Sequence, residues 1–318
     1  MSDDKSLLGQ KVLVTGASGF LGAHLSQRLG QNGAVVTGVS RSARPRDSVC
    51  HRWFRADMAS LESVEEAFKL AQPEVIFHLS GYGVGSPHLE NILPTFRNDL
   101  LTTVNVLTVA ARQRVRRFIM AASLEEPQTG AADSIPSTPY AAAKWASSSY
   151  ARMFHRLYGT PIVLTRPMMT YGPGQKPHKL IPYVTCALLR GEAPKLSSGN
   201  RTADWVYVDD VVDGMLAAAV TPDIDGSSID LGSGTLVSIR DVVLQLAEII
   251  GSKVAPELGS LPDRPMEKVR IADIDEAFKK LAWKQRTSLR AGLQQTVEWY
   301  RSELDCFNHR SASGGGAQ

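Results

Sequence analysis

Short apolar runs alternate with stretches of helical length over the first half of this 318-residue chain. Repeated strand-helix units of this kind bury apolar strands on both faces of a parallel sheet. The runs that we expect to form strands are residues 11–15, 34–39, 53–55, 75–79, 118–122 and 162–165. The sequence therefore predicts an α/β fold with a doubly wound parallel sheet.

Three glycines follow the first predicted strand and open the first predicted helix. They are Gly16, Gly19 and Gly22, and Phe20 and Leu21 begin the helix. Glycines at this point let the backbone turn tightly and approach a pyrophosphate, with the helix N-terminus directed at its charge. The motif in this context favours a Rossmann-type dinucleotide-binding domain over a merely flexible loop.

The amino-acid composition of the chain changes after residue 166. Proline and glycine become frequent in residues 167–177, and shorter elements are expected at 181–190, 205–208 and 269–272. We expect a dinucleotide-binding domain over residues 1–166, with later strands returning to its sheet, and a smaller, mainly substrate-binding C-terminal region over 167–308. An amphipathic last helix is expected at about 289–304, and residues 309–318 are expected to form a disordered tail.

The end of the second predicted strand bears on the choice of nicotinamide cofactor. An acidic residue there would bind the ribose hydroxyls and repel a 2'-phosphate, but this chain has Ser40 and Arg41, with Arg44 nearby. The pattern favours NADP(H) and leaves NAD possible; alternatively, both arginines are solvated surface charges. Asp57, after the third strand, is expected to accept a hydrogen bond from the adenine amine or to cap the next helix.

Tyr140 and Lys144 stand four residues apart and so share one face of a helix, downstream of Ser123 at the end of an apolar run. We expect the Lys144 ammonium to favour the ionised form of the Tyr140 phenol, which makes Tyr140 an acid/base, and Ser123 to hold the substrate oxygen. Taken alone, the tyrosine-lysine spacing fits an exposed helix pair equally well. Together with the glycine motif it indicates hydride transfer.

Composition excludes several other classes of protein. Lys and Arg number 35 against 32 Asp and Glu, which does not indicate a nucleic-acid partner. No apolar stretch reaches the ~18 residues that span a bilayer, and the three cysteines are widely spaced, so we expect a cytoplasmic protein with no membrane association. The histidines lack close ligand spacing, so no metal site is predicted, and His78 is expected in the core.

With these motifs the chain resembles the extended short-chain dehydrogenase/reductase family, in particular its nucleotide-sugar epimerases, dehydratases and ketoreductases. The matching stretches include residues 15–22, 75–80, 118–123, 140–144, 166–174, 179–182, 204–210 and 296–300. The resemblance implies a Ser123–Tyr140–Lys144 catalytic triad, with Asn98 completing a proton path through water. It also implies a homodimer that pairs through helices such as the one expected at residues 138–157. The positions expected to contact the cofactor are Gly16, Ser18, Gly19, Phe20, Leu21, Gly22, Ser40, Arg41, Arg44, Asp57, Met58, Leu79, Tyr140 and Lys144.

The resemblance further implies that residues 171–174 and 179–182 border the diphosphate of a nucleotide sugar. The expected substrate-binding residues are Met169, Lys179, Leu180, Arg201 and Arg264. Two positions depart from the family pattern, because Met169 stands near a usual Asn and Ala203 where an Arg usually precedes the Asp204 position. Either Arg201 replaces that arginine from a shifted position, which we favour, or the substrate lacks a diphosphate.

The residues after Ser123 distinguish the reactions of the family. The 4,6-dehydratases commonly carry an acid pair there, whereas this chain has Leu124 followed by Glu125. Glu125 remains as a base for a ring proton, or caps a loop. We expect a 4-ketoreductase first, an epimerase that retains NAD as the close alternative, and a 4,6-dehydratase third. A redox sensor that binds the dinucleotide without catalysis is the non-enzymatic alternative.

Overall fold

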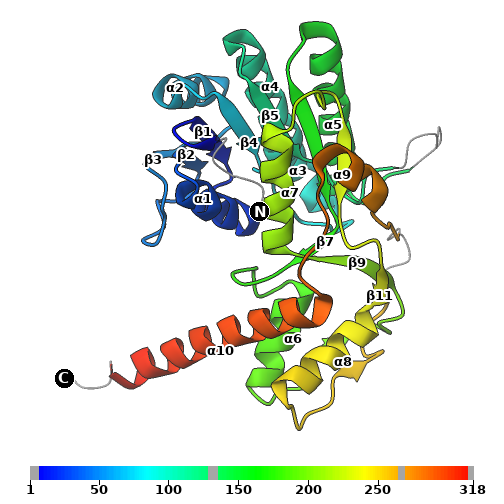
Figure 1. Ribbon diagram of the computed structural model, residues 1–318. Coiled ribbons are helices and arrows are strands. Elements are labelled where there is room, and N and C mark those ends of the chain that lie inside the picture. The colour runs from blue at the N-terminus through cyan, green and yellow to red at the C-terminus, as the bar shows by residue number, and fades with distance from the viewer. Residues whose placement is uncertain (1–6, 128–134, 264–268, 314–318) are drawn as a thin grey trace.

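The computed structural model describes residues 7–127, 135–263 and 269–313, and within these ranges a parallel sheet of seven strands forms the centre of the molecule (Figure 1). The strand order is β10-β6-β5-β4-β1-β2-β3, and the chain order reverses between β1 and β4. In open sheets of this kind ligands bind beyond the carboxyl ends of the strands at such a switch point. The strands are β1 (Lys11–Thr15), β2 (Val35–Ser40), β3 (Arg52–Arg55), β4 (Val75–His78), β5 (Arg117–Ala121), β6 (Ile162–Pro167) and β10 (Ser228–Leu231). The predicted doubly wound α/β fold is confirmed.

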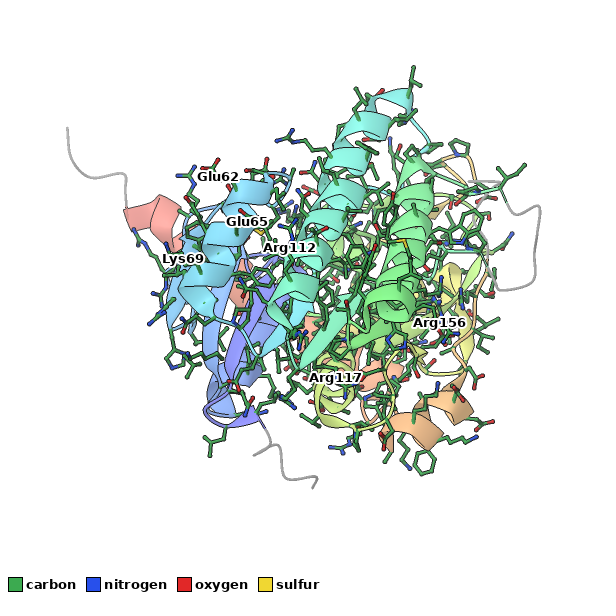
Figure 2. The ribbon with its side chains drawn as sticks, turned by 90° about the horizontal axis from the view of Figure 1, so that it is seen from above. Glu62, Glu65, Lys69, Arg112, Arg117 and Arg156 are labelled. Atoms are coloured by element: carbon green, nitrogen blue, oxygen red, sulfur yellow. The ribbon has the colours of Figure 1, made fainter. Side chains whose placement is uncertain are left out.

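Helices cover both faces of the main sheet. On one face lie α1 (Phe20–Gln31), α7 (Val208–Val220) and α9 (Ile274–Leu281); on the other lie α2 (Leu61–Ala71), α4 (Thr102–Gln113) and α5 (Pro139–Tyr158). Figure 2, seen from above, shows α2, α4 and α5 side by side, and Arg112 on α4 lies 3.2 Å from the carboxylate of Glu65 on α2. The sheet is thus enclosed on both sides, as a parallel sheet requires.

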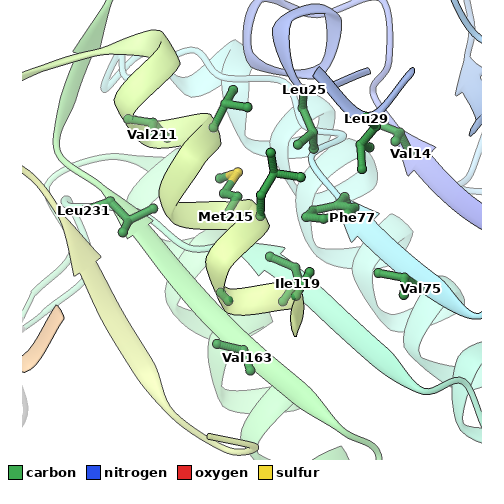
Figure 3. Close-up of a cluster of buried hydrophobic side chains, with 14 of the residues drawn as sticks. Val14, Leu25, Leu29, Val75, Phe77, Ile119, Val163, Val211, Met215 and Leu231 are labelled. Carbon is green, nitrogen blue, oxygen red and sulfur yellow. The ribbon is translucent and has the colours of Figure 1, made fainter. Parts of the chain in front are cut away.

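The strands divide their apolar side chains between two cores because successive residues of a strand point to opposite faces. Val12 and Val14 join the core under α1 and α7, whereas Leu13 between them joins the core under α2, α4 and α5. Figure 3 shows the first core, where Met215 of α7 lies over Phe77 and Ile119 of the sheet. Rigid packing on both faces fixes the strand ends at which the candidate site lies.

The helix that carries Tyr140 and Lys144 begins at a well-defined cap. Thr138 accepts a hydrogen bond from Ala141 N at 3.0 Å, and Pro139 occupies the first helical position. At the other end Gly159 adopts the left-handed conformation with φ of 64°. The helix therefore ends within one residue of the predicted range 138–157.

The helix preceding β5 contains an irregular segment. A short 3₁₀ turn η2 (Leu89–Asn91) and helix α3 (Ile92–Thr95) lead into a π-helical segment η3 (Phe96–Leu101), which continues directly into α4. A π segment inside an α-helix inserts an additional residue and changes which side chains face the neighbouring elements. It is packed against α5, and it contains both Asn98 and Asp99.

The smaller C-terminal part contains two short sheets and three helices among the described residues. Strand β9 (Thr202–Tyr207) lies between β7 (Met169–Tyr171) and β11 (Leu236–Ser238), and β8 (Lys195–Leu196) pairs with β12 (Glu257–Leu258). Helices α6 (Leu180–Leu189), α8 (Ile239–Ile250) and α10 (Leu289–Ser313) pack on one another below the main sheet in Figure 1, and α10 projects outward.

Two expectations for this part were wrong. Residues 269–272 form neither a strand nor a helix; their backbone is held instead by a side chain, because Ala272 N donates to Asp204 Oδ2 at 2.9 Å. The last helix does not end near residue 304 but continues to Ser313, so residues 309–313 of the predicted disordered tail are helical. Residues 314–318 of that tail lie outside the described residues. No helix in the described ranges is long and apolar enough to cross a bilayer.

Candidate active site

The glycine loop has the shape of a cradle for a dinucleotide. A Cβ on Gly16 would lie 2.8 Å from Ser80 N, and a Cβ on Gly22 would lie 2.2 Å from the carbonyl oxygen of Gly16, so neither position accepts a side chain. Gly16 also needs its positive φ of 71°. The first turn of α1 carries no acidic residue, and its cap residue, Gly19, offers no side chain to the free amides. These residues fit a pyrophosphate, because its charge is stabilised at an open helix N-terminus.

A buried polar chain connects the end of β1 with the first turn of α4. Thr15 Oγ1 lies 2.9 Å from His78 Nδ1, and His78 Nε2 lies 3.0 Å from Thr103 Oγ1. Burial, together with the charge of Lys144, lowers the pKa of His78 to about 3, so this ring is neutral. His78 is thus a hydrogen-bonded core residue, as the sequence indicated.

The side chains at the end of β2 and just after it bind partners in different parts of the structure. Ser40 Oγ lies 2.5 Å from Ser18 Oγ on the glycine loop, and Arg41 Nη1 donates to Asn98 Oδ1 at 2.6 Å. Arg44, however, donates to the carbonyl oxygen of Cys50 at 2.6 Å and so holds its own loop together. The structure therefore brings Ser18, Ser40 and Arg41 to the edge of the cradle, whereas the guanidinium of Arg44 is bound to the loop backbone.

The other expected cofactor contacts lie around the same edge. Leu79 follows β4, and its carbonyl carbon and oxygen border the place where a Gly16 Cβ would lie, at 2.9 Å. Asp57 accepts hydrogen bonds from Arg97 at 2.8 Å and from Ala59 N at 3.0 Å, and the same groups lower its pKa against the opposing effect of burial. The alternative that Asp57 caps the next helix was wrong, because Ser60 is the cap of α2 and accepts Ser63 N at 3.3 Å; Asp57 is an ionised acceptor. Met58 is buried. Phe20 and Leu21 in the first turn of α1 pack against a third apolar core, which lies in the C-terminal part and contains Tyr171 and Trp205.

Ser123 and Tyr140 meet between β5 and α5. Their hydroxyl groups are hydrogen-bonded to each other, and Ser123 Oγ also accepts Glu125 N at 3.2 Å. The sequence predicted a lowered pKa for Tyr140, and this was wrong. Burial raises the pKa of Tyr140 above its ordinary value, the nearby Asp99 charge raises it further, and the bond from Ser123 opposes both. Tyr140 is thus a neutral phenol that holds its proton more tightly than an exposed tyrosine does.

Lys144 lies on the same face of α5, as its spacing predicted, but it does not bind the phenol. Its Nζ donates to the carbonyl oxygen of Ala121 at the end of β5, and the side chain is buried. Burial lowers the pKa of Lys144, while the charges of Asp99 and Glu126 raise it. The ammonium therefore belongs to a buried group of charges behind the two hydroxyls.

The π-helical segment directs Asn98 and Asp99 to different sides. Asn98 binds Arg41 and donates to Pro94 O at 2.6 Å, so it faces the cofactor cradle rather than the triad. Asp99 interacts electrostatically with Tyr140 and Lys144 instead, and it accepts Tyr82 N at 3.1 Å. Burial raises the pKa of Asp99 to about 6, although Lys144 and the Tyr82 amide lower it. Sequence reasoning missed Asp99, because a helical pattern does not reveal a π insertion.

Glu125 lies at the opening beyond Ser123. Thr138 Oγ1 donates to its Oε2 at 3.1 Å, and a Cβ on Gly85 would lie 3.0 Å from its Oε1. A carboxylate therefore stands between the loop after β4 and the start of α5. The adjacent Leu124 is apolar and packs partly against the core under α7.

A small pocket beside Leu124 collects part of the expected substrate site. It is lined by Leu124, Met169, Arg201, Thr202, Ala203, Asp204, Val269 and Arg270. Lys179 Nζ donates to Gly83 O at 3.1 Å and so joins the loop before α6 to the loop after β4, while Leu180 begins α6. Met169 and Arg201 are thus brought together, Lys179 and Leu180 lie in the neighbouring loop, and Arg264 lies outside the described residues.

The pocket also contains Arg270, which sequence reasoning missed. It lies in a segment, residues 269–272, for which the sequence predicted a short element but which is irregular, so periodicity could not predict the direction of its side chain. No three His, Cys, Asp or Glu side chains in the described part of the chain are grouped to hold a metal ion.

Comparisons with known proteins agree with this geometry. The model of the NAD dependent epimerase/dehydratase family matches residues 12–232, which is more than half of the chain. The chain is 30% identical to a probable dTDP-glucose 4,6-dehydratase of Sinorhizobium fredii (91% of this chain, 92% of that protein) and 29% identical to a UDP-glucose 4-epimerase of Mycolicibacterium smegmatis (92% and 99%).

A similar solved structure shows the same fold with ligands. The UDP-glucuronic acid 4-epimerase of Bacillus cereus, in complex with UDP-glucuronic acid and NAD, superposes with a TM-score of 0.82 at 25% identity, over 92% of this chain and 99% of that one. Its cofactor is NAD, so the expected preference for NADP gains no support. The match over most of both chains places this protein, an enzyme, in the NAD-dependent epimerase/dehydratase family of extended short-chain dehydrogenases.

Proposed function

We propose that this protein is an NAD-dependent nucleotide-sugar 4-epimerase. The observation that carries the proposal is the hydrogen-bonded pair of Ser123 and Tyr140, next to Leu124 in place of the first acid of a dehydratase pair. Both reactions begin by oxidation at a sugar hydroxyl, but loss of water requires a further proton donor to the leaving hydroxyl. Leu124 has no proton to give. The similarity to a UDP-glucose 4-epimerase and to a 4-epimerase in complex with NAD favours the epimerase over the 4-ketoreductase that the sequence analysis placed first.

Each residue of the site has a chemical task in this proposal. Tyr140 must be ionised to take the proton of the sugar hydroxyl, and the phenol that is formed returns this proton when the hydroxyl is restored; Ser123 hydrogen-bonds the same oxygen and the phenol. Lys144 and Asp99 form a buried pair of opposite charges whose fields act on Tyr140 and on each other. The glycine loop would hold the pyrophosphate of NAD, and the cofactor would supply a reversible acceptor for hydride from the sugar carbon.

Retention of NAD follows from the cradle in this proposal. An epimerase must return the hydride to the same sugar, so its cofactor stays bound through the cycle. The two close backbone approaches at Gly16 and Gly22 and the bond between Ser18 and Ser40 shape a fixed site for this cofactor. The guanidinium of Arg44 is engaged by its own loop, so only Arg41 of the two arginines lies at the cradle among the described side chains.

The substrate is proposed to be a sugar linked to a nucleoside diphosphate. Arg201 and Arg270 line the pocket beside Leu124, and Lys179 lies at the loop before α6. A group of cations suits a diphosphate, because the charge of a diphosphate is spread over several oxygens. The similarity to epimerases of UDP-sugars supports the same class of substrate.

The test is to incubate the purified protein with NAD and UDP-glucose or UDP-glucuronic acid and to follow the sugar by NMR. An epimerase yields the C4 epimer without net formation of NADH. Release of water with a 4-keto-6-deoxy sugar would show a dehydratase, and stoichiometric consumption of NADPH by a keto sugar would show a reductase. A protein that binds NAD but turns over none of these substrates would contradict the proposal.

The sequence resemblance implied a homodimer that pairs through helices such as α5, and exposed apolar side chains lie on α5 and on the neighbouring η2–η3 segment. Leu89, Leu93 and Phe96 of the η2–η3 segment are exposed, as are Tyr150 and Leu157 of the neighbouring α5. We propose that two copies pair through these apolar side chains. Light scattering of the purified protein tests this, and a monomer at micromolar concentration would contradict it.

A further inference from the structure

The turn that ends β5 is closed by a carboxylate. Ser123 N donates to Glu126 Oε1 at 2.8 Å, and Glu126 N donates to Ser123 O at 3.2 Å. The two bonds run in opposite directions across four residues and so fix the backbone on which the Ser123 hydroxyl stands. The hydroxyl itself is bound by Tyr140.

The same carboxylate oxygen also binds the helix of Tyr140. Ser148 Oγ donates to Glu126 Oε1 at 2.9 Å, and Ser148 lies on α5, about two turns beyond Tyr140. Side-chain exposure of Glu126 is 1%, so water does not compete for these bonds. Glu126 therefore ties the serine turn and the tyrosine helix to one point.

Two guanidinium groups balance this buried carboxylate. Arg166 Nη2 lies 4.0 Å from Glu126 Oε2, and the same arginine binds Asp230. Arg270 Nη1 donates to Glu126 O at 3.3 Å, and its Nε lies 3.8 Å from Asp230. The two arginines and the carboxylates of Glu126 and Asp230 thus form one buried group of charges, which fixes the position of the Glu126 side chain.

Arg270 connects this group with the substrate pocket. It lines the pocket together with Leu124, which immediately follows Ser123. The serine turn is therefore supported on one side by α5 and on the other by the wall of the pocket. A small displacement of the turn would move the Ser123 hydroxyl relative to both Tyr140 and the substrate.

We propose that Glu126 is a positioning residue, which holds Ser123 in the geometry that the hydrogen bond to Tyr140 and the reaction require. The inference rests on the proposed function, because it assigns Ser123 a task in turnover. Misplacing a reacting group by ~1 Å costs up to about a hundredfold in rate. Loss of the carboxylate should therefore lower kcat rather than substrate binding.

The test compares Glu126→Ala and Glu126→Gln with the wild-type enzyme. Removing the acceptor in Glu126→Ala should lower kcat by about ten- to a hundredfold with KM changed by less than about threefold. Glu126→Gln keeps an acceptor oxygen for Ser123 N and should recover most of the loss. If Glu126→Ala does not fold, Ser148→Ala replaces it, because it removes one donor from Oε1 and should lower kcat by a few-fold.

A matched control is Asp210→Asn. This carboxylate is also buried and accepts two backbone amides, Arg286 N at 3.2 Å and Thr287 N at 3.0 Å, but it lies on α7 and holds the linker before α10. It should lower the melting temperature without lowering kcat. An equal loss of kcat in Asp210→Asn would overturn the inference.

The decisive measurement is the effect of Glu126→Ala on kcat in an enzyme that already carries Ser123→Ala. A residue that acts through the Ser123 hydroxyl has no further effect on kcat once that hydroxyl is gone, whereas a merely structural residue keeps its effect. Unchanged kcat in Glu126→Ala, or an undiminished effect in the Ser123→Ala background, refutes the positioning role.

The proposed function is judged separately by wild-type turnover of UDP-sugars. If the wild type turns over none, that function fails, and the crystal structure of Glu126→Ala, or of Ser148→Ala if that variant does not fold, then decides the inference. A Ser123 hydroxyl displaced from Tyr140 supports it, and one that stays in place overturns it.

Discussion

Asp204 holds together the wall of the substrate pocket, and its replacement by Asn should destabilise the protein by about 3 kcal/mol. Its Oδ1 accepts Ser233 N at 2.6 Å and Ser233 Oγ at 2.7 Å; its Oδ2 accepts Gly234 N at 3.0 Å and Ala272 N at 2.9 Å. The residue is 1% exposed. In its best orientation Asp204→Asn keeps its oxygen for Gly234 N and Ala272 N and turns its NH₂ group to Ser233, where the hydroxyl can accept but the backbone N–H loses its acceptor. Each buried donor left unsatisfied costs about 1–3 kcal/mol.

Urea denaturation measures this cost, with an expected fall in the midpoint and an unchanged m value. For a chain of this size 3 kcal/mol corresponds to a fall in Tm of about 6 °C. Asp263→Asn is the control, because that carboxylate also accepts hydrogen bonds, from N and Oγ of Ser198, but is exposed, so water replaces a lost partner. It should shift Tm by less than about 1 °C. A shift in Asp204→Asn as small as that of the control would refute the reasoning.

Three further outcomes are expected. Replacing Tyr140 with Phe should lower turnover at least a hundredfold and leave NAD binding, measured by calorimetry, unchanged; a similar loss of binding would contradict its role as acid/base. The pKa of Asp99 is about 6 in the native protein and 3.8 in the unfolded chain, so the native protein holds a proton that the unfolded chain releases between these values. As the pH rises from 3.8 to 6, the free energy of unfolding of the wild type should therefore fall by up to about 3 kcal/mol relative to that of Asp99→Asn. A difference that is flat across this range, measured by urea denaturation, would be inconsistent with that pKa. Leu93→Glu should convert a dimer into a monomer in light scattering, whereas Glu62→Lys on the distant α2 should not.

Much of the fold was predictable because it depends on local periodicity and on glycine chemistry. The strand-helix alternation fixed six strands to within one or two residues, and the cradle depends on Gly16 and Gly22, where no side chain fits. The failures occurred where contacts distant in sequence decide the structure. Residues 269–272 have a strand-like composition, yet Asp204 holds their backbone in an irregular path.

The candidate site was predictable in its members but not in its electrostatics. The spacing of Tyr140 and Lys144 correctly placed them on one helix face. It could not show that burial has the largest effect on the pKa of the Tyr140 phenol, or that Lys144 donates to the carbonyl oxygen of Ala121. The same limit applies to Arg44. A basic residue after β2 suggests a phosphate site, and only the fold shows that its guanidinium is bound to the loop backbone.

The π-helical segment explains why the predicted proton path and the observed charges differ. In a regular helix adjacent side chains point about 100° apart, and the wider π turn resets which of them faces α5. Here Asn98 turns to Arg41 and Asp99 turns to the buried charges of the triad. Its Oδ1 has no hydrogen-bond partner among the described residues, and a Cβ on Gly81 would lie 2.5 Å from it. A carboxyl group so confined holds a proton easily, and this is why Asp99, rather than Asn98, governs the charge state around Tyr140.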